Sequence, residues 1–279
     1  MRVSVIIPVY NEEGSIKECL ESLERQKYPD FEVIVVDDGS KDRTKNIVQS
    51  AEGKYRKYKL KMVEQKHGGA GAARNLGAKH ARGEVLVFVD ADMTFGEMFL
   101  KELVAPIVAG KAVGTTTRAE YVSNWDNRWA RCWNYNENMP EGKRHKGKSG
   151  ELGVYRAIKR SVFNEVGGFE PGGYDDDLSL RAKFGQDPVE TKARLYHKNP
   201  QSLGEVFRQA RWAGKRSYKL GSLGVGYALV RVSLPVGLIV GITKSLYYRC
   251  TEFVVFKLVY NSGASLGILS YHIKGQGGK

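Results

Sequence analysis

Four runs of strand-like sequence occur in the N-terminal third of the chain, at residues 3–7, 31–36, 60–64 and 85–89, and all but the third are largely apolar. An apolar run without polar alternation is typical of a strand that is buried on both faces. Between the runs, apolar residues such as Ile16, Leu20 and Leu23 recur with helical spacing. This alternation predicts a mostly parallel α/β sheet with helices on both faces.

Carboxylates follow two of these runs directly. Asp37 and Asp38 end the second run, and Asp90 and Asp92, separated by Ala91, end the fourth. Open α/β sheets hold their ligands at the carboxyl ends of strands. Two carboxylates there can bind a hard cation that neutralises a diphosphate. Taken alone, an Asp-x-Asp sequence is equally compatible with a solvated turn, and Asp37 with capping of the next helix.

The sequence lacks the two common glycine-rich nucleotide loops. Residues 8–12 follow the first strand without a Gly-x-Gly turn, and no Gly-x-x-x-x-Gly-Lys-Ser/Thr motif occurs. Gly69-Ala-Gly71 is followed by Arg74, where a dinucleotide fingerprint needs a small residue. We therefore expect a nucleotide to be bound by side chains.

The positive charge is concentrated at one end of the chain. The net charge is +13 over 279 residues, and residues 192–279 hold all but one unit of it, with Glu205 and Glu252 as their only acids. Such an excess suits an anionic membrane surface or nucleic acid. Here the bases are interleaved with apolar runs, which favours a membrane surface and no nucleic acid. The three separated cysteines fit a reducing compartment.

Several separated motifs resemble those of family 2 glycosyltransferases. They are Pro8-Val-Tyr-Asn-Glu12, Val35-Val-Asp-Asp-Gly-Ser40, Ala73-Arg-Asn-x-Gly77 and Asp90-Ala-Asp92, in the same order and approximate spacing. The resemblance covers roughly residues 1–220. It implies an inverting, nucleotide-sugar-dependent catalytic domain of the GT-A fold over 1–220. Residues 221–279 would then be a basic, partly apolar helical region.

The resemblance also implies roles for residues around the nucleotide. Asp38 would accept a hydrogen bond from a uracil ring, which offers an N–H donor. Pro8 and Tyr10 would pack against the base, and Glu12 would lie on the ribose side. Arg74 would reach the nucleotide from its helix; the alternative for Arg74 is a surface salt bridge.

A divalent cation is the implied cofactor, either Mg²⁺ or Mn²⁺. Asp92, beyond Ala91 in the Asp-x-Asp motif, would be its direct ligand, and Asp90 would face the ribose or the metal. The cation would bridge the diphosphate and stabilise the leaving nucleotide. His197 lies where some related enzymes have a metal-ligating histidine. A structural role for His197 is equally compatible with the sequence.

Three consecutive carboxylates, Asp175, Asp176 and Asp177, precede Leu178. Alignment with the family's pattern places Asp175 on the general base, with Asp176 as the alternative, although Tyr174 stands where the family has Glu. Inversion is a single in-line displacement, and a carboxylate must take the proton of the attacking hydroxyl. The competing explanation is acids placed at a helix N-terminus.

Aromatic and apolar residues give the second half a different character. Trp125, Trp129 and Trp133 recur every fourth residue, which predicts one face of a helix. Packing is the favoured role of this stripe and an acceptor platform the alternative. Residues 201–220 predict a cationic amphipathic helix. The apolar runs 232–243 and 253–268 are marginal for spanning a bilayer. They better fit interfacial helices or a packed appendage.

These observations predict a glycosyltransferase that moves a sugar from a nucleoside diphosphate sugar, UDP-linked in preference, to a hydroxyl or phosphate of a glycan or lipid-linked acceptor. Polysaccharide or glycolipid biosynthesis would be its setting, at the cytoplasmic face of a membrane, since no signal peptide is evident at Met1. A homo-oligomer is compatible with the sequence. The alternatives are a nucleotidyltransferase, which usually opens with a Gly-rich loop, and a nucleic-acid-binding protein.

Overall fold

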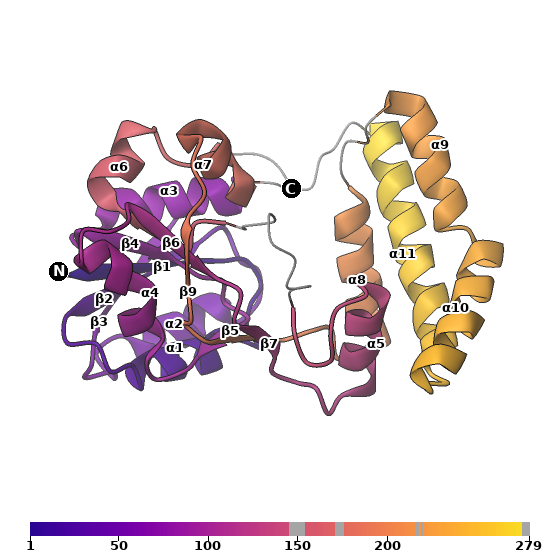
Figure 1. The fold of residues 1–279 in the computed structure, drawn as a ribbon, viewed down its shortest axis with the longest axis horizontal. Coiled ribbons are helices and arrows are strands. Elements are labelled where there is room, and N and C mark those ends of the chain that lie inside the picture. The colour runs from indigo at the N-terminus through magenta and orange to yellow at the C-terminus, as the bar shows by residue number, and fades with distance from the viewer. Residues whose placement is uncertain (145–153, 171–175, 216–217, 219, 275–279) are drawn as a thin grey trace. The chain divides into compact units, whose positions relative to one another are not determined.

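The computed structural model describes residues 1–144, 154–170, 176–215, 218 and 220–274 (Figure 1). By its internal contacts the chain forms two compact units. Unit 1 comprises residues 1–121 and 147–197, and unit 2 comprises residues 122–146 and 198–279. This division differs from the one expected at residue 220, because the helix at 203–214 packs within unit 2.

Unit 1 is built on a seven-stranded sheet with the strand order β3-β2-β1-β4-β8-β6-β9 (Figure 1). Strands β1 to β4 run parallel, as expected, and β6 pairs in parallel with β9. Strand β8 is antiparallel to both of its neighbours, β4 and β6. The bounds are β1 Val3–Val9, β2 Phe31–Asp37, β3 Lys59–Glu64, β4 Val85–Phe88, β6 Gly114–Thr117, β8 Ala157–Lys159 and β9 Val189–Thr191.

Helices cover both faces of this sheet because alternate strand residues point to opposite sides. In β1, Val3, Val5 and Ile7 share a buried cluster with α1 (Ile16–Glu24), α2 (Thr44–Ala51) and α4 (Phe99–Val108). On the other face, Ile6 packs with α3 (Ala70–His80) and α6 (Arg160–Glu165), and α7 (Asp176–Phe184) joins the same cluster. The expected α/β architecture is confirmed.

A second, three-stranded sheet has the order β5-β10-β7. It joins the segment after β4 to two segments that lie further along the chain. Its strands are β5 (Met93–Phe95), β7 (Glu120–Val122) and β10 (Leu195–His197). Strand β5 pairs antiparallel with β10, and this register places His197 opposite Met93. A residue far along the chain is thereby brought next to Asp92.

Unit 2 is helical and consists of α5 (Arg128–Asn136), α8 (Leu203–Gly214), α9 (Gly221–Arg231), α10 (Leu234–Tyr248) and α11 (Phe253–Lys274). Helices α8 and α11 approach closely through glycines. A Cβ atom added at Gly267 would lie 2.1 Å from the backbone oxygen of Arg211, and one at Gly263 would lie 2.5 Å from that of Phe207. Small residues four apart on one helix allow this close packing of backbones.

The tryptophan stripe is only partly helical. Helix α5 begins at Arg128, and the side chain of Asn127 caps it by accepting from the N–H groups of Trp129 and Ala130. Trp125 therefore precedes the helix, since the chain must turn at the cap. Trp125, Trp129 and Trp133 pack against a buried cluster of unit 2. The expected packing role is confirmed.

Candidate active site

Asp90 lies just beyond β4, between two buried arginines of unit 1. Arg74 of α3 donates to Asp90 Oδ1 at 2.7 Å, and Nη1 of Arg156 lies 3.6 Å from Oδ2. Burial alone would raise the pKa of Asp90, but the guanidinium charges, with a further contribution from His197, lower the pKa to about 2. The side chain of Arg74 is only 7% exposed, so the alternative of a surface salt bridge is wrong. Asp90 is an ionised carboxylate held by two cations.

Asp92 pairs with His197 across the small sheet. His197 Nε2 lies 2.8 Å from Asp92 Oδ1, and the side chain of Asp92 is 34% exposed. Ala91, between the two acids, is buried and contributes no polar group. The expected proximity of His197 to the Asp-x-Asp motif is present in the structure.

The spacing of Asp92 and His197 bears on whether the pair could bind a divalent cation. Octahedral cations bind their ligands at about 2.1 Å, which separates neighbouring ligands by about 3 Å. The 2.8 Å between His197 Nε2 and Asp92 Oδ1 suits such a pair of adjacent ligands. Within the described chain no third metal-binding side chain joins them, and the buried Nδ1 of His197 has no hydrogen-bond partner. Asp90 turns its oxygens to arginines, so Asp92 and His197 are the better candidates.

Glu12 lies in the turn after β1, close enough to Asp90 and Asp92 for their charges to affect its pKa. Its pKa is raised to about 7, chiefly by burial and further by the charges of Asp92 and Asp90, against a hydrogen bond from Ser15. The Ser15 hydroxyl is 2.5 Å from Glu12 Oε2. Ser15 makes no side-chain cap on α1, and the Asn11 side chain accepts from Lys41 N–H. Glu12 thus belongs to the acidic group at the carboxyl end of the sheet.

The carboxylate of Asp38 accepts from a loop that follows β3. Oδ1 accepts from Gln65 Nε2 and Gly68 N, both at 2.7 Å. Oδ2 accepts from Gly69 N at 2.9 Å and lies 2.8 Å from His67 Nδ1. A carboxylate offers about four acceptor sites. A base N–H that binds Asp38 must therefore replace a donor, and the side chains of Gln65 and His67 are the ones that can rotate away.

Tyr10 presents an aromatic face beside Asp38. It is 41% exposed and stacks on His67, with ring centroids 4.3 Å apart. Pro8 lies at the end of β1, opposite Val36 of β2. Pro8, Tyr10 and Asp38 therefore come together at the carboxyl ends of β1 and β2. Asp37 does not cap a helix; its oxygens accept from Ser40 N–H and hold the turn.

The expected general base lies at the limit of the described chain. Asp175 is outside the described residues, and Asp176 begins α7 but its side chain is outside them too. Phe169, within the described residues that end at 170, is held by α3. Asn75 of α3 donates to the carbonyl of Phe169 at 2.8 Å and accepts from the Phe169 N–H at 2.9 Å. This clamp explains the asparagine next to Arg74.

Sequence reasoning missed two residues of the site, Arg156 and His67. Arg156 bridges Asp90 and Glu120, with its Nη2 3.2 Å from Glu120 Oε1. A lone arginine between apolar residues, as in Tyr155-Arg-Ala-Ile158, signals a buried charge that needs a partner. His67 stacks on Tyr10. No sequence pattern predicts this contact, because it depends on the conformation of the loop after β3.

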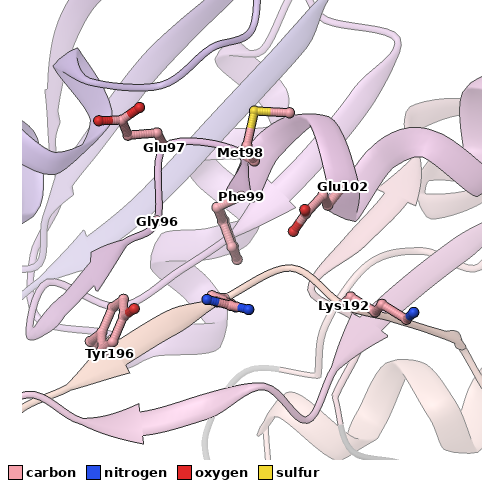
Figure 2. A pocket seen from close by; sticks show the side chains of 8 residues that line it. Gly96, Glu97, Met98, Phe99, Glu102, Lys192 and Tyr196 are labelled. Atoms are coloured by element: carbon pink, nitrogen blue, oxygen red, sulfur yellow. The ribbon is translucent and has the colours of Figure 1, made fainter.

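A cavity of about 300 Å³ lies elsewhere in unit 1 (Figure 2). It contains none of the expected site residues. Tyr196 lines it, whereas the adjacent His197 points to Asp92, because successive strand residues face opposite sides. Its lining residues are Gly96, Glu97, Met98, Phe99, Glu102, Lys192, Arg194 and Tyr196.

Relatives of the chain carry transferase names. Poly(ribitol-phosphate) beta-N-acetylglucosaminyltransferase TarS of Staphylococcus aureus is 43% identical over 107 residues, which are 38% of this chain and 18% of TarS. Poly(ribitol-phosphate) beta-glucosyltransferase of Bacillus spizizenii is 39% identical over 127 residues, 42% of this chain and 20% of that protein. The matches therefore span only a small part of these longer relatives.

Two solved structures share the fold over most of the chain. The crystal structure of S. aureus TarS 1–349 in complex with UDP-GlcNAc has a TM-score of 0.56 at 19% identity, covering 99% of this chain and 93% of that one. The mannosyltransferase PcManGT from Pyrobaculum calidifontis, in complex with GDP-Man and Mn²⁺, has a TM-score of 0.57 at 21% identity, covering 96% and 86%.

The family model described as Glycosyl transferase family 2 matches residues 4–167, which is more than half of the chain and includes Asp38, Arg74, Asp90 and Asp92. The expected resemblance is thereby confirmed, and the chain belongs to glycosyl transferase family 2.

Proposed function

We propose that the chain is an inverting glycosyltransferase that moves a sugar from a UDP-sugar to a hydroxyl or phosphate of a glycan or lipid-linked acceptor. One observation carries the proposal: Asp92 with His197, and Asp90 between two arginines, lie together at the carboxyl end of β4. The partly exposed carboxylate of Asp92 can bind a cation. The guanidinium groups of Arg74 and Arg156 can bind a phosphate or hold the carboxylate of Asp90.

The nucleoside would lie over β1 and β2. Tyr10 and Pro8 would pack against the base, and Asp38 would accept its N–H after His67 or Gln65 gives up its place. The oxygens of Asp90 keep acceptor capacity beyond the two arginines and can take ribose hydroxyl groups. Glu12 would lie on the ribose side, next to Asp90 and Asp92.

The transfer itself is a single displacement. The acceptor hydroxyl attacks the anomeric carbon as the diphosphate departs on the opposite face, and its proton passes to the carboxylate of Asp175, with Asp176 as the alternative. Asp92 and His197 would hold Mg²⁺ or Mn²⁺, which supplies charge neutralisation for the leaving diphosphate. The names and bound ligands of TarS and PcManGT support the donor class, and they include both UDP and GDP donors.

Calorimetric titration of UDP and GDP, with and without Mn²⁺, tests the proposal on the wild-type chain and on Asp92→Ala. We expect Mn²⁺-dependent UDP binding that Asp92→Ala abolishes. Glu97→Ala is the matched control, because Glu97 pairs with Lys27 at the surface, away from Asp92. GDP binding in place of UDP would overturn the donor assignment, and absence of binding to folded protein would overturn the transferase proposal.

A further inference from the structure

Exposed apolar side chains are distributed very unevenly along the described chain. Among the large hydrophobic residues that are exposed, six lie before residue 220 and thirteen lie between residues 220 and 269. Soluble domains rarely leave a contiguous apolar surface uncovered, and such a surface marks an interaction site. The thirteen are Leu220, Leu223, Tyr227, Val230, Leu234, Leu238, Ile239, Ile242, Leu246, Tyr247, Val255, Leu266 and Leu269.

In helix α10, the exposed apolar residues lie away from the side of the helix that packs against the protein. Its inner side packs within unit 2: Gly237 and Gly241 contact α11, and Lys244 donates to the carbonyl groups of Tyr135 and Asn136 at the end of α5. The opposite side carries exposed residues at helical spacing, namely Leu234, Leu238, Ile242 and Leu246. The apolar side chains of α10 are therefore concentrated on the side that the rest of unit 2 does not cover.

Helix α9 continues this exposed surface. Leu223, Tyr227 and Val230 recur on one side of α9 and are 79%, 67% and 63% exposed. Within unit 2, α9 and α10 lie on the side of α11 away from α8 (Figure 1). We call the exposed sides of α9 and α10 the outer apolar face; it consists of Leu223, Tyr227, Val230, Leu234, Leu238, Ile239, Ile242, Leu246 and Tyr247.

Charge identifies the partner of the outer apolar face. Arg231, the last residue of α9, and Arg249, directly after α10, are both exposed, and Glu252 is the only acid in residues 220–274. A second copy of the same face would bring arginines together, which costs free energy. An anionic lipid surface accepts both the apolar side chains and the flanking cations. Tyr227 and Tyr247 suit the same boundary between water and hydrocarbon.

Helix lengths favour an interfacial position. Helices α9 and α10 have 11 and 15 residues; together they are long and apolar enough to cross a membrane, but they are bent by 52° at their break. A spanning helix needs about 20 apolar residues. Helix α11 is long and apolar enough to span by length and composition alone, but 39% of that stretch is buried in the structure and it packs on α8 and α10.

We propose that the outer apolar face of α9 and α10 binds the interface of an anionic bilayer, with Arg231 and Arg249 at the lipid headgroups. This proposal rests on unit 2 alone and does not depend on the proposed transfer reaction. Removing the C-terminal helices is not a clean test, because the packing surface of α8 on α11 would be exposed. Surface substitutions leave that packing intact.

The test is co-sedimentation of the full chain with vesicles of phosphatidylcholine, with or without an equal part of phosphatidylglycerol. We expect the wild type to bind the anionic vesicles, and about 0.5 M NaCl to weaken binding. The double substitution Leu238→Ser/Ile242→Ser should reduce binding about tenfold or more. Arg231→Gln/Arg249→Gln should reduce it several-fold, and only on anionic vesicles.

Val108→Ser/Val189→Ser is the matched control, since both valines are exposed in unit 1. It should bind like the wild type, and circular dichroism should show that every variant is folded. Equal binding by Leu238→Ser/Ile242→Ser and the wild type, or no binding by the wild type, would overturn the proposal. Sedimentation of the wild type as a dimer that the same double substitution dissociates, without vesicle binding, would instead identify the face as a self-association surface.

Discussion

The two units differ in the contacts that hold their elements together and in what they leave exposed. Unit 1 hides its apolar residues in the sheet and its helices, and it also buries Arg74 and Arg156 against Asp90 and Glu120. Unit 2 joins α8 to α11 through glycine contacts and leaves an apolar surface uncovered. Beyond their apolar clusters, unit 1 therefore depends on compensated buried charges and unit 2 on close backbone contacts. The predictions below separate these two sources of stability.

The largest effect is expected from Arg156→Leu. This substitution removes the guanidinium group that lies 3.2 Å from the buried Glu120 carboxylate and 3.6 Å from Asp90. Breaking a buried ion pair on one side costs about 3–5 kcal/mol of unfolding free energy. Denaturant unfolding of the variant measures the loss. Arg43→Leu, which removes the cation of the exposed Arg43–Glu13 pair, is the control, and equal losses in both variants would contradict the assigned role of the buried charge.

A slightly smaller loss is expected from Gly267→Ala in unit 2. The added Cβ would lie 2.1 Å from the backbone oxygen of Arg211, so α8 and α11 must separate. Overpacking of this kind costs about 1–3 kcal/mol. Gly226→Ala in α9 is the matched control: nothing lies near its Cβ, and the helix propensity of alanine should stabilise it by about 0.5–1 kcal/mol. Thermal unfolding should therefore move in opposite directions for the two variants.

Glu12→Gln should stabilise unit 1 in a pH-dependent way. The pKa of Glu12 is raised from 4.5 to about 7, so between these values the folded chain holds a proton that the unfolded chain has lost. The unfolding free energy of the wild type therefore falls as the pH rises through this window. The variant should gain about 2 kcal/mol over the wild type at pH 8 and almost nothing at pH 4.

The measurement is urea unfolding at both pH values with a chelator present. Glu13→Gln is the control, because hydrogen bonds from Arg43 lower the pKa of Glu13 and the sign is reversed. The wild-type Glu13 carboxylate stabilises the fold above pH 4.5, so Glu13→Gln should be less stable than the wild type at pH 8. A gain for Glu12→Gln that does not change with pH would contradict the buried carboxylate.

The smallest effect is expected from Leu246→Ser on the outer apolar face. Leu246 is 75% exposed, so its loss should change the unfolding free energy in solution by less than about 0.5 kcal/mol. Ala210→Ser on α8, which is fully buried, is the contrasting variant and should cost more. Equal losses would show that Leu246 packs against the protein.

The sequence predicted the parallel sheet and the position of its acids because both depend on local patterns. Apolar runs such as Val85–Val89 read as buried strands, and Asp90 and Asp92 follow directly. The partners of these acids depend on tertiary contacts that no local pattern encodes. Arg156 lies directly before the antiparallel strand β8, and His67 reaches Tyr10 through a loop. The start of α5 at Arg128 was missed because the capping residue Asn127 interrupts the tryptophan spacing.

The antiparallel strand β8 has a consequence for synthesis on the ribosome. Strands β1 to β4 are contiguous in the sequence and can pair as soon as they emerge, with Arg74 already beside Asp90. Arg156 and His197 are translated much later, because Arg156 lies directly before β8 and His197 is the last residue of β10. Domains form from the N-terminus during translation. A nascent chain that ends before residue 156 therefore carries the Asp-x-Asp motif but neither of its later partners, and the site is completed only when β8 and β10 are added.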